Sequence, residues 1–86
     1  MKVIFGDQFI KSADKLPSRI QKKLDGLLVI MSRNPYDPLL HTKRLSGVLA
    51  GYFSFRITRE WRALFQFLDS QTLQLLRIAH RKDIYR

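Results

Sequence analysis

Residues 51–68 read Gly51-Tyr-Phe-Ser-Phe-Arg-Ile-Thr-Arg-Glu-Trp-Arg-Ala-Leu-Phe-Gln-Phe-Leu68. Apolar and polar side chains alternate along most of this stretch, with a polar break at residues 59–60. An alternation of period two is typical of a β-strand with one buried face. The stretch therefore predicts two neighbouring antiparallel strands, at 53–58 and 62–68, joined by a short turn.

The alternation also assigns side chains to the two faces of these strands. One face carries the apolar residues Phe53, Phe55, Ile57, Ala63, Phe65 and Phe67. The opposite face carries Ser54, Arg56, Thr58, Arg62, Leu64 and Gln66. We therefore expect Arg56 and Arg62 on the face that points away from the main core.

The segments on either side complete the predicted fold. A third strand is expected at 73–79 after a turn at 69–71, and a short first strand at 2–5. Apolar residues at helical spacing predict two helices, one from Asp7 to Leu16 and one from Pro17 to Arg33.

Residues 34–38, Asn-Pro-Tyr-Asp-Pro, form a strong stop signal after the second helix. We expect 39–51 to be a loop. The order β-α-α-β-β-β predicts a single α+β domain over 1–86. An N-terminal strand leads to an αα-hairpin, which packs on one face of a three-stranded antiparallel meander.

The composition favours a polyanionic partner. The 86 residues include 16 Lys and Arg but only 7 Asp and Glu, which gives a formal net charge of +9. Arginine dominates the basic residues after position 42 and binds phosphate in a forked geometry. A surface that is merely solvated is the alternative. A chain that is 45% hydrophobic is rich enough to fold.

Several kinds of site have no support in the sequence. No cysteine is present, the histidines at 41 and 80 are far apart, and no carboxylate pair has metal-ligand spacing. A phosphate-binding glycine loop and a serine nucleophile motif are also missing. We expect no metal and no cofactor, and we interpret His41 as a solvated loop residue.

The N-terminus turns polar too soon for a signal peptide, and no apolar run approaches the roughly 20 residues that span a bilayer. We therefore expect a cytoplasmic protein without membrane contact.

The C-terminal segment 78–86, Ile-Ala-His-Arg-Lys-Asp-Ile-Tyr-Arg, concentrates chemically useful side chains. A histidine transfers protons near neutral pH, arginines hold phosphate, and a tyrosine stacks on a base. The alternative is a basic tail, ending at Arg86, whose tyrosine docks on the core. Strict alternation places His80 on the same face as Leu76 and Ile78, so it reaches an outer cleft only if a bulge near Ala79 intervenes.

Three motifs in this order resemble the RelE/ParE superfamily of type II toxin–antitoxin toxins. They are Lys43-Arg-Leu-Ser-Gly47, Gly51-Tyr-Phe-Ser-Phe-Arg-Ile-Thr-Arg-Glu-Trp-Arg62 and Ile78-Ala-His-Arg-Lys-Asp-Ile-Tyr85. The resemblance extends over essentially the whole chain. It implies either a RelE-like endoribonuclease that cuts mRNA in the ribosomal A site, or a ParE-like inhibitor of DNA gyrase. In both branches a cognate antitoxin neutralises the toxin.

The resemblance also implies roles for individual residues. The expected catalytic set is Arg62, His80, Arg81 and Tyr85. The expected RNA-binding set is Lys43, Arg44, Arg56 and Arg59. Lys43 stands where some members place a glutamate base, and the family's frequent C-terminal helix is missing.

RNA supplies its own nucleophile, the 2′-hydroxyl, so its cleavage requires no metal. We expect a metal-independent mRNA endoribonuclease with an acidic antitoxin as its partner. The alternatives are a gyrase inhibitor and a basic nucleic-acid-binding module without catalysis.

Overall fold

The alternating stretch forms the predicted antiparallel strands. The computed structural model describes residues 1–85, so Arg86 of the predicted tail lies outside the described residues. Strand β3 (Phe53–Arg56) pairs antiparallel with β4 (Trp61–Asp69), and β4 pairs antiparallel with β5 (Thr72–His80). The predicted meander is confirmed. Strand β3 ends at Arg56, earlier than expected, because the N–H groups of Ile57 and Thr58 both donate to the Trp61 carbonyl, at 2.9 and 3.2 Å, where the chain turns.

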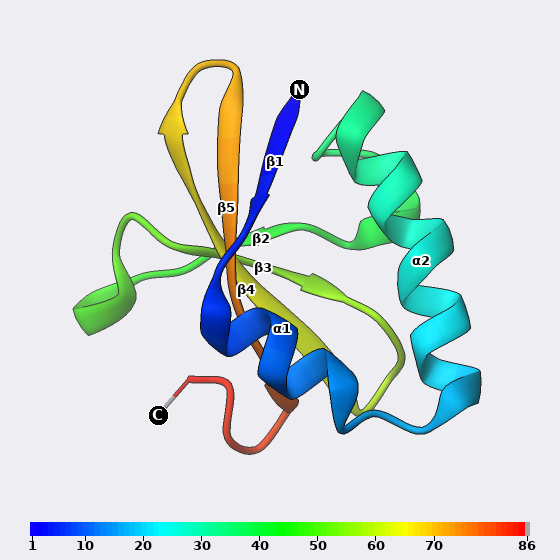
Figure 1. The fold of residues 1–86 in the computed structure, drawn as a ribbon. Coiled ribbons are helices and arrows are strands. Elements are labelled where there is room, and N and C mark those ends of the chain that lie inside the picture. Colours follow the sequence, from blue (N-terminus) through cyan, green and yellow to red (C-terminus); the bar gives the residue numbers. More distant parts are fainter. Residues whose placement is uncertain (86) are drawn as a thin grey trace.

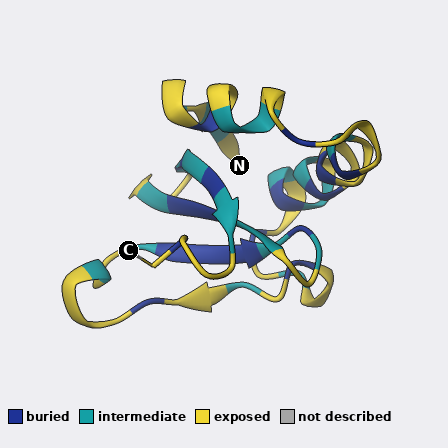
Figure 2. Cartoon of the chain, turned by 90° about the horizontal axis from the view of Figure 1, so that it is seen from below, coloured by how far each residue is buried: buried dark blue, intermediate teal, exposed yellow. Residues whose placement is uncertain are grey.

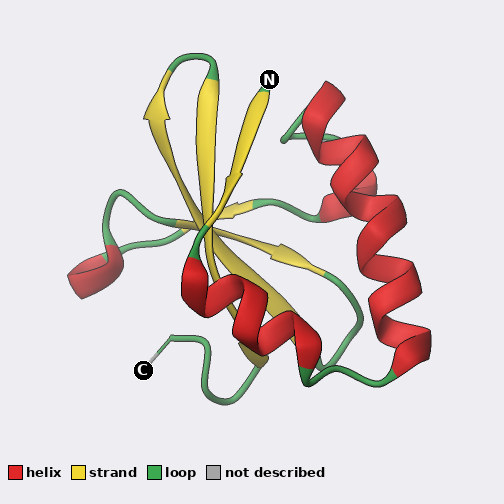
Figure 3. Ribbon diagram, in the orientation of Figure 1, coloured by secondary structure: helices red, strands yellow, loops and turns green. Residues whose placement is uncertain are grey.

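The meander is the centre of a five-stranded sheet with the order β1-β5-β4-β3-β2 (Figure 3). The remaining elements are β1 (Lys2–Phe5), α1 (Asp7–Asp14), α2 (Ser18–Arg33), β2 (Lys43–Arg44) and two 3-10 helices, η1 (Pro38–Leu40) and η2 (Gly47–Leu49). Strand β1 lies parallel to β5 (Figure 1). The expected α+β class and its element order are confirmed.

The predicted loop over 39–51 contains short elements that the sequence pattern does not reveal. Strand β2 has two residues and pairs Lys43 with Ser54 at the edge of β3. Leu45 extends this edge by donating its N–H to the Tyr52 carbonyl at 3.0 Å. Two residues are too few to show a period, so only the tertiary contact reveals this strand.

Both helices pack on one side of the sheet (Figure 2). Pro17 precedes α2 with a φ of −55°, which suits the start of a helix. The Gln21 side chain donates to the Ala13 carbonyl at 2.9 Å and so joins the two helices across this turn. The buried stripe of α2 consists of Ile20, Leu24, Leu27 and Met31.

A second, smaller cluster lies on the opposite face of the sheet, where the chain returns after β5. Its fully buried residue, Ile84, packs with Leu45 and Leu64. This face is therefore partly covered by the C-terminal tail and partly open. Among the helices of residues 1–85, none has the length and apolar character needed to cross a membrane.

The regular alternation of β5 is interrupted by a bulge. The pairing with β4 steps from Leu64↔Arg77 to Phe65↔Leu75, which leaves Leu76 as an extra residue. Leu76 packs with the small outer cluster, whereas Leu75 and Ile78 belong to the main core. The bulge restores Ile78, and with it residue 80, to the helix side of the sheet.

Candidate active site

The C-terminal tail and the outer face of the sheet enclose a cleft with a cavity of about 560 Å³. Its walls come from β2, β3, β4, the loop before β2 and the tail after β5. The residues that line it are His41, Lys43, Ser54, Arg56, Arg62, Arg81, Lys82 and Tyr85. Five of these are Lys or Arg, and none of the described residues in the lining is a carboxylate. The cleft is therefore strongly cationic.

The two arginines of the sheet lie directly opposite each other. Arg56 on β3 pairs in register with Arg62 on β4. Like charges at opposed positions destabilise a pair of strands. In addition, the Nε atoms of both side chains are buried without a hydrogen-bond partner among residues 1–85. The guanidinium groups of both arginines line the cleft, where a phosphate can accept hydrogen bonds from them and offset both charges.

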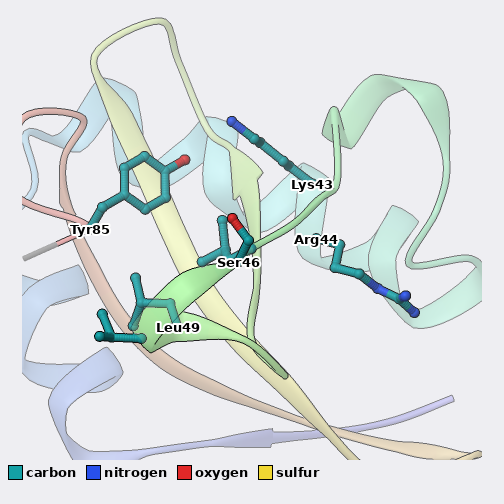
Figure 4. Close-up of a pocket in the computed structure, with 7 residues that line it drawn as sticks. Lys43, Arg44, Ser46, Leu49 and Tyr85 are labelled. Atoms are coloured by element: carbon teal, nitrogen blue, oxygen red, sulfur yellow. The ribbon is translucent and has the colours of Figure 1, made fainter.

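Tyr85 closes the cleft on the side of the tail. Its hydroxyl lies 3.3 Å from Ser54 Oγ, and its ring lies 6.0 Å from Lys43 Nζ. Figure 4 shows the Lys43 side chain extending toward the side of Tyr85 while Arg44 points away. Tyr85 remains 42% exposed, so its ring is accessible for stacking.

The tail is fixed by hydrogen bonds as well as by the burial of Ile84. Arg77 donates to the carbonyls of Ile84, at 2.6 Å, and Asp83, at 3.3 Å. The N–H groups of Asp83 and Ile84 both donate to the His80 carbonyl. These bonds hold Tyr85 in place in a segment that forms turns over the described residues 81–85.

A smaller pocket of about 230 Å³ adjoins the cleft and shares Lys43 and Tyr85 with it (Figure 4). Its remaining walls are mixed, with Leu45, Val48 and Leu49 beside Arg44 and Ser46. The η2 turn, which carries Val48 and Leu49, starts at Gly47, whose φ of +65° favours glycine.

The structure does not bring His80 into the cleft. Because the bulge lies at Leu76 and not near Ala79, His80 faces the helix side. Its ring meets Trp61 edge-on, with 5.8 Å between centroids, and its Nδ1 accepts from the Lys82 N–H at 3.2 Å. There it lines a separate cavity of about 400 Å³ beside Ile20.

Two of the expected RNA-binding residues also lie outside the cleft lining. Arg44 turns to the opposite side of β2, and its guanidinium carbon lies 5.6 Å from the centre of the Phe53 ring. Arg59 is exposed in the turn between β3 and β4. Of the predicted set, the structure brings together Lys43, Arg56, Arg62, Arg81 and Tyr85.

The sequence interpretation missed three residues of the lining. Ser54 lies on the predicted outer face, and Lys82 lies within the basic C-terminal segment, so their positions could have suggested them. The sequence does not indicate that His41 lies at the cleft, because the loop that carries it shows no regular alternation of apolar and polar residues. Its φ of 49° is the one positive value of a non-glycine residue in the described chain.

Outside the cleft, one carboxyl group has a shifted pKa. At the β4–β5 turn, the pKa of Asp69 is lowered, chiefly by the hydrogen bond from the Gln71 N–H at 2.8 Å. Among residues 1–85, no three His, Asp or Glu side chains gather as a potential metal site.

Comparison with known proteins places this geometry among toxins. No protein-family model and no curated protein matches the sequence. Among solved structures, a chain of the RelBE2 toxin–antitoxin complex from Mycobacterium tuberculosis is 32% identical, with a TM-score of 0.78, covering 93% of this chain and 96% of that one.

Two further solved structures are similar. The YoeB/ParE toxin from Agrobacterium tumefaciens is 26% identical, with a TM-score of 0.80, covering 94% of this chain and 99% of that one. YafQ from Escherichia coli, at 18% identity and a TM-score of 0.80, covers 99% and 98% of the two chains and shares the fold.

Proposed function

This chain belongs to the RelE/ParE superfamily of type II toxin–antitoxin toxins, and from this membership and its cationic cleft we propose that it is a ribosome-dependent mRNA endoribonuclease. The reaction needs no metal ion, because the attacking group is the 2′-hydroxyl of the RNA itself. The enzyme must hold the nucleotide in line, stabilise charge on the phosphoryl oxygens and transfer two protons.

The observation that carries this proposal is the opposed pair Arg56 and Arg62, whose buried Nε donors have no partner among the described residues. Two arginines held together against their repulsion form a site that a phosphate completes. Arg81 adds a third guanidinium to the same cleft. Together these groups stabilise the extra negative charge that develops as phosphorus becomes five-coordinate.

Lys43 and Tyr85 complete the proposed site. The Tyr85 ring offers a stacking surface for a base, and its hydroxyl is a proton donor for the departing 5′-oxygen. Lys43 lies beside this ring, where its charge holds the adjacent phosphate. We assign the phosphate-binding and charge-stabilising roles to the arginines, and the positioning of the nucleotide to Lys43 and Tyr85.

The same membership leads us to propose a cognate antitoxin as the protein partner. The Mycobacterium tuberculosis relative is a chain of a toxin–antitoxin complex. A net charge of +9 favours an acidic partner segment that folds on binding. Such a segment neutralises the toxin if it covers the cleft and its buried donors.

The test is cleavage of translated mRNA, mapped by primer extension after induction of the protein. Wild type should produce discrete cuts inside reading frames, and Arg62→Ala should lower the cleavage rate by about 10²–10³-fold. Arg19→Ala removes the same charge from the helix side of the sheet and serves as the matched control. It should cut like wild type.

The alternatives give different results in this experiment. A gyrase inhibitor would produce a DNA damage response without mRNA cuts. A nucleic-acid-binding module without catalysis would leave cells healthy. Either outcome contradicts the proposed endoribonuclease.

A further inference from the structure

His41 lines the cleft together with the arginines, although the sequence assigns it no role. We propose that His41 is the general base that removes the proton from the 2′-hydroxyl. This inference rests on the proposed endoribonuclease function and names a catalytic residue that completes its chemistry.

The first argument is the choice of proton acceptors. Five of the eight lining residues are Lys or Arg, which as cations have no free lone pair. Ser54 and Tyr85 are weakly basic hydroxyls within hydrogen-bond distance of each other. The remaining lining residue is His41, and a neutral imidazole accepts a proton readily near neutral pH.

The second argument is that the loop holds His41 in a fixed place. The residue before it, Leu40, is fully buried, and the hydroxyl of the residue after it, Thr42, donates to the Pro35 carbonyl at 2.5 Å. The Asp37 side chain accepts from the Leu39 N–H at 2.9 Å and caps the η1 turn. His41 is thus anchored on both sides.

The backbone of His41 is also in an unusual conformation. Its φ of 49° and ψ of 44° lie in the left-handed region, which is uncommon for residues other than glycine and in which asparagine, aspartate and histidine are the most frequent exceptions. A conformation of this kind persists where the surrounding structure determines it, and it is frequent at functional sites. The left-handed residue ends η1 and places the imidazole at the cleft just before β2 begins.

The groups around His41 match the needs of the reaction. From the strands, Lys43, Arg56 and Arg62 face the same cavity; from the tail, Arg81, Lys82 and Tyr85 do so. These cations stabilise the alkoxide that forms when the 2′-hydroxyl loses its proton. His80, the other histidine of the chain, faces the opposite side of the sheet and cannot take part there.

The proposed step balances as follows. An imidazole nitrogen of His41 accepts the 2′-hydroxyl proton as the 2′-oxygen forms a bond to phosphorus. The bond from phosphorus to the 5′-oxygen breaks, and the leaving oxygen takes a proton from the Tyr85 hydroxyl. The products are a 2′,3′-cyclic phosphate and a 5′-hydroxyl end. Water then returns both residues to their starting protonation states.

The test measures single-turnover cleavage of ribosome-bound mRNA as a function of pH. His41→Asn keeps a residue that tolerates the left-handed backbone but removes the base. It should lower the cleavage rate by about 10²–10⁴-fold and abolish the rise of the rate with pH that a general base produces. Binding to programmed ribosomes should stay within twofold of wild type.

Two further variants separate catalysis from loop structure. Leu39→Ala alters an exposed neighbour outside the cleft lining and should cleave like wild type. His41→Gly removes the side chain and relieves the backbone conformation, so added imidazole should restore part of its activity. A residue that only shapes the loop would not be rescued by imidazole.

The inference is overturned if His41→Asn keeps the wild-type rate and pH profile while wild type cuts mRNA; the proposed function then stands. It is also overturned if both His41 variants lose activity, imidazole rescues neither, and the midpoints of their thermal unfolding are lower than that of wild type. These results would mean that His41 serves the loop structure only. If wild type cuts no mRNA at all, the proposed function itself fails and His41 loses its role with it.

Discussion

The opposed positions of Arg56 and Arg62 are electrostatically unfavourable in the folded chain. Two like charges are opposed across β3 and β4, and their buried Nε atoms lack partners among residues 1–85. Each feature alone lowers stability. A binding site for phosphate explains both features, because a bound anion accepts charge-assisted hydrogen bonds from the two arginines and offsets their repulsion.

This explanation predicts the stability of a variant. Arg56→Met keeps the aliphatic length but removes the charge and one unpartnered donor, so it should raise the free energy of unfolding by on the order of 1 kcal/mol at low salt. Adding inorganic phosphate should then stabilise wild type more than the variant. Thermal unfolding across a phosphate series measures both effects.

The matched control is Arg19→Met, which removes the same charge from the other side of the sheet. Its response to phosphate should equal that of wild type. Equal stabilisation of wild type and Arg56→Met by phosphate would show that the arginine pair is no anion site.

The arginine pair and the two histidines show which side-chain positions can be predicted from the sequence pattern and which cannot. The alternation placed Arg56 and Arg62 on one face because a strand of period two fixes every side chain once one is known. His80 depended on where β5 bulges, and the extra residue turned out to be Leu76. His41 depended on how an irregular loop folds over the sheet, which no local pattern encodes.

At the scale of elements, long periodic segments were predictable and short ones were not. The buried stripe of α2 and the alternation of β4 each extend over enough residues to define a period. The two-residue β2 exists because the β3 edge accepts it. The parallel pairing of β1 with β5 likewise joins ends of the chain that are distant in sequence.

The junction between β1 and α1 requires glycine for this pairing. A Cβ on Gly6 would lie 2.7 Å from the backbone oxygen of Leu75, the atom that accepts the Gly6 N–H at 2.9 Å. Gly6→Ala must therefore push β1 away from β5, and it should lower the free energy of unfolding by about 1–3 kcal/mol. Denaturant titration measures this change.

Gly26 on α2 provides the matched control for the same substitution. A Cβ there meets no atom within 4 Å. Gly26→Ala should therefore raise the free energy of unfolding by about 0.8–1.0 kcal/mol, the helix-propensity difference. If both alanine variants changed stability in the same direction, the close approach at Gly6 would not govern the junction.

At the scale of the whole molecule, the cleft exists because the chain covers both faces of its sheet unequally. The helices pack over the main core on one face, and the tail covers only part of the other face through Ile84. The remaining opening collects cations from three strands and the tail. Five of the 16 Lys and Arg residues thus gather in one cleft without a carboxylate in its lining, which composition alone does not reveal.

This concentration of charge predicts how RNA binding depends on salt. Each cation that neutralises a phosphate of single-stranded RNA contributes about 0.7 to the slope of log K against log salt. Arg81→Ala removes one cleft cation and should flatten the slope by about that amount, whereas Arg19→Ala on the helix side should leave it unchanged. Fluorescence anisotropy with a 2′-O-methyl oligonucleotide, which resists cleavage, measures both. Equal flattening by the two variants would mean that RNA responds to the total charge of the protein and not to the cleft that the tail and the sheet build together.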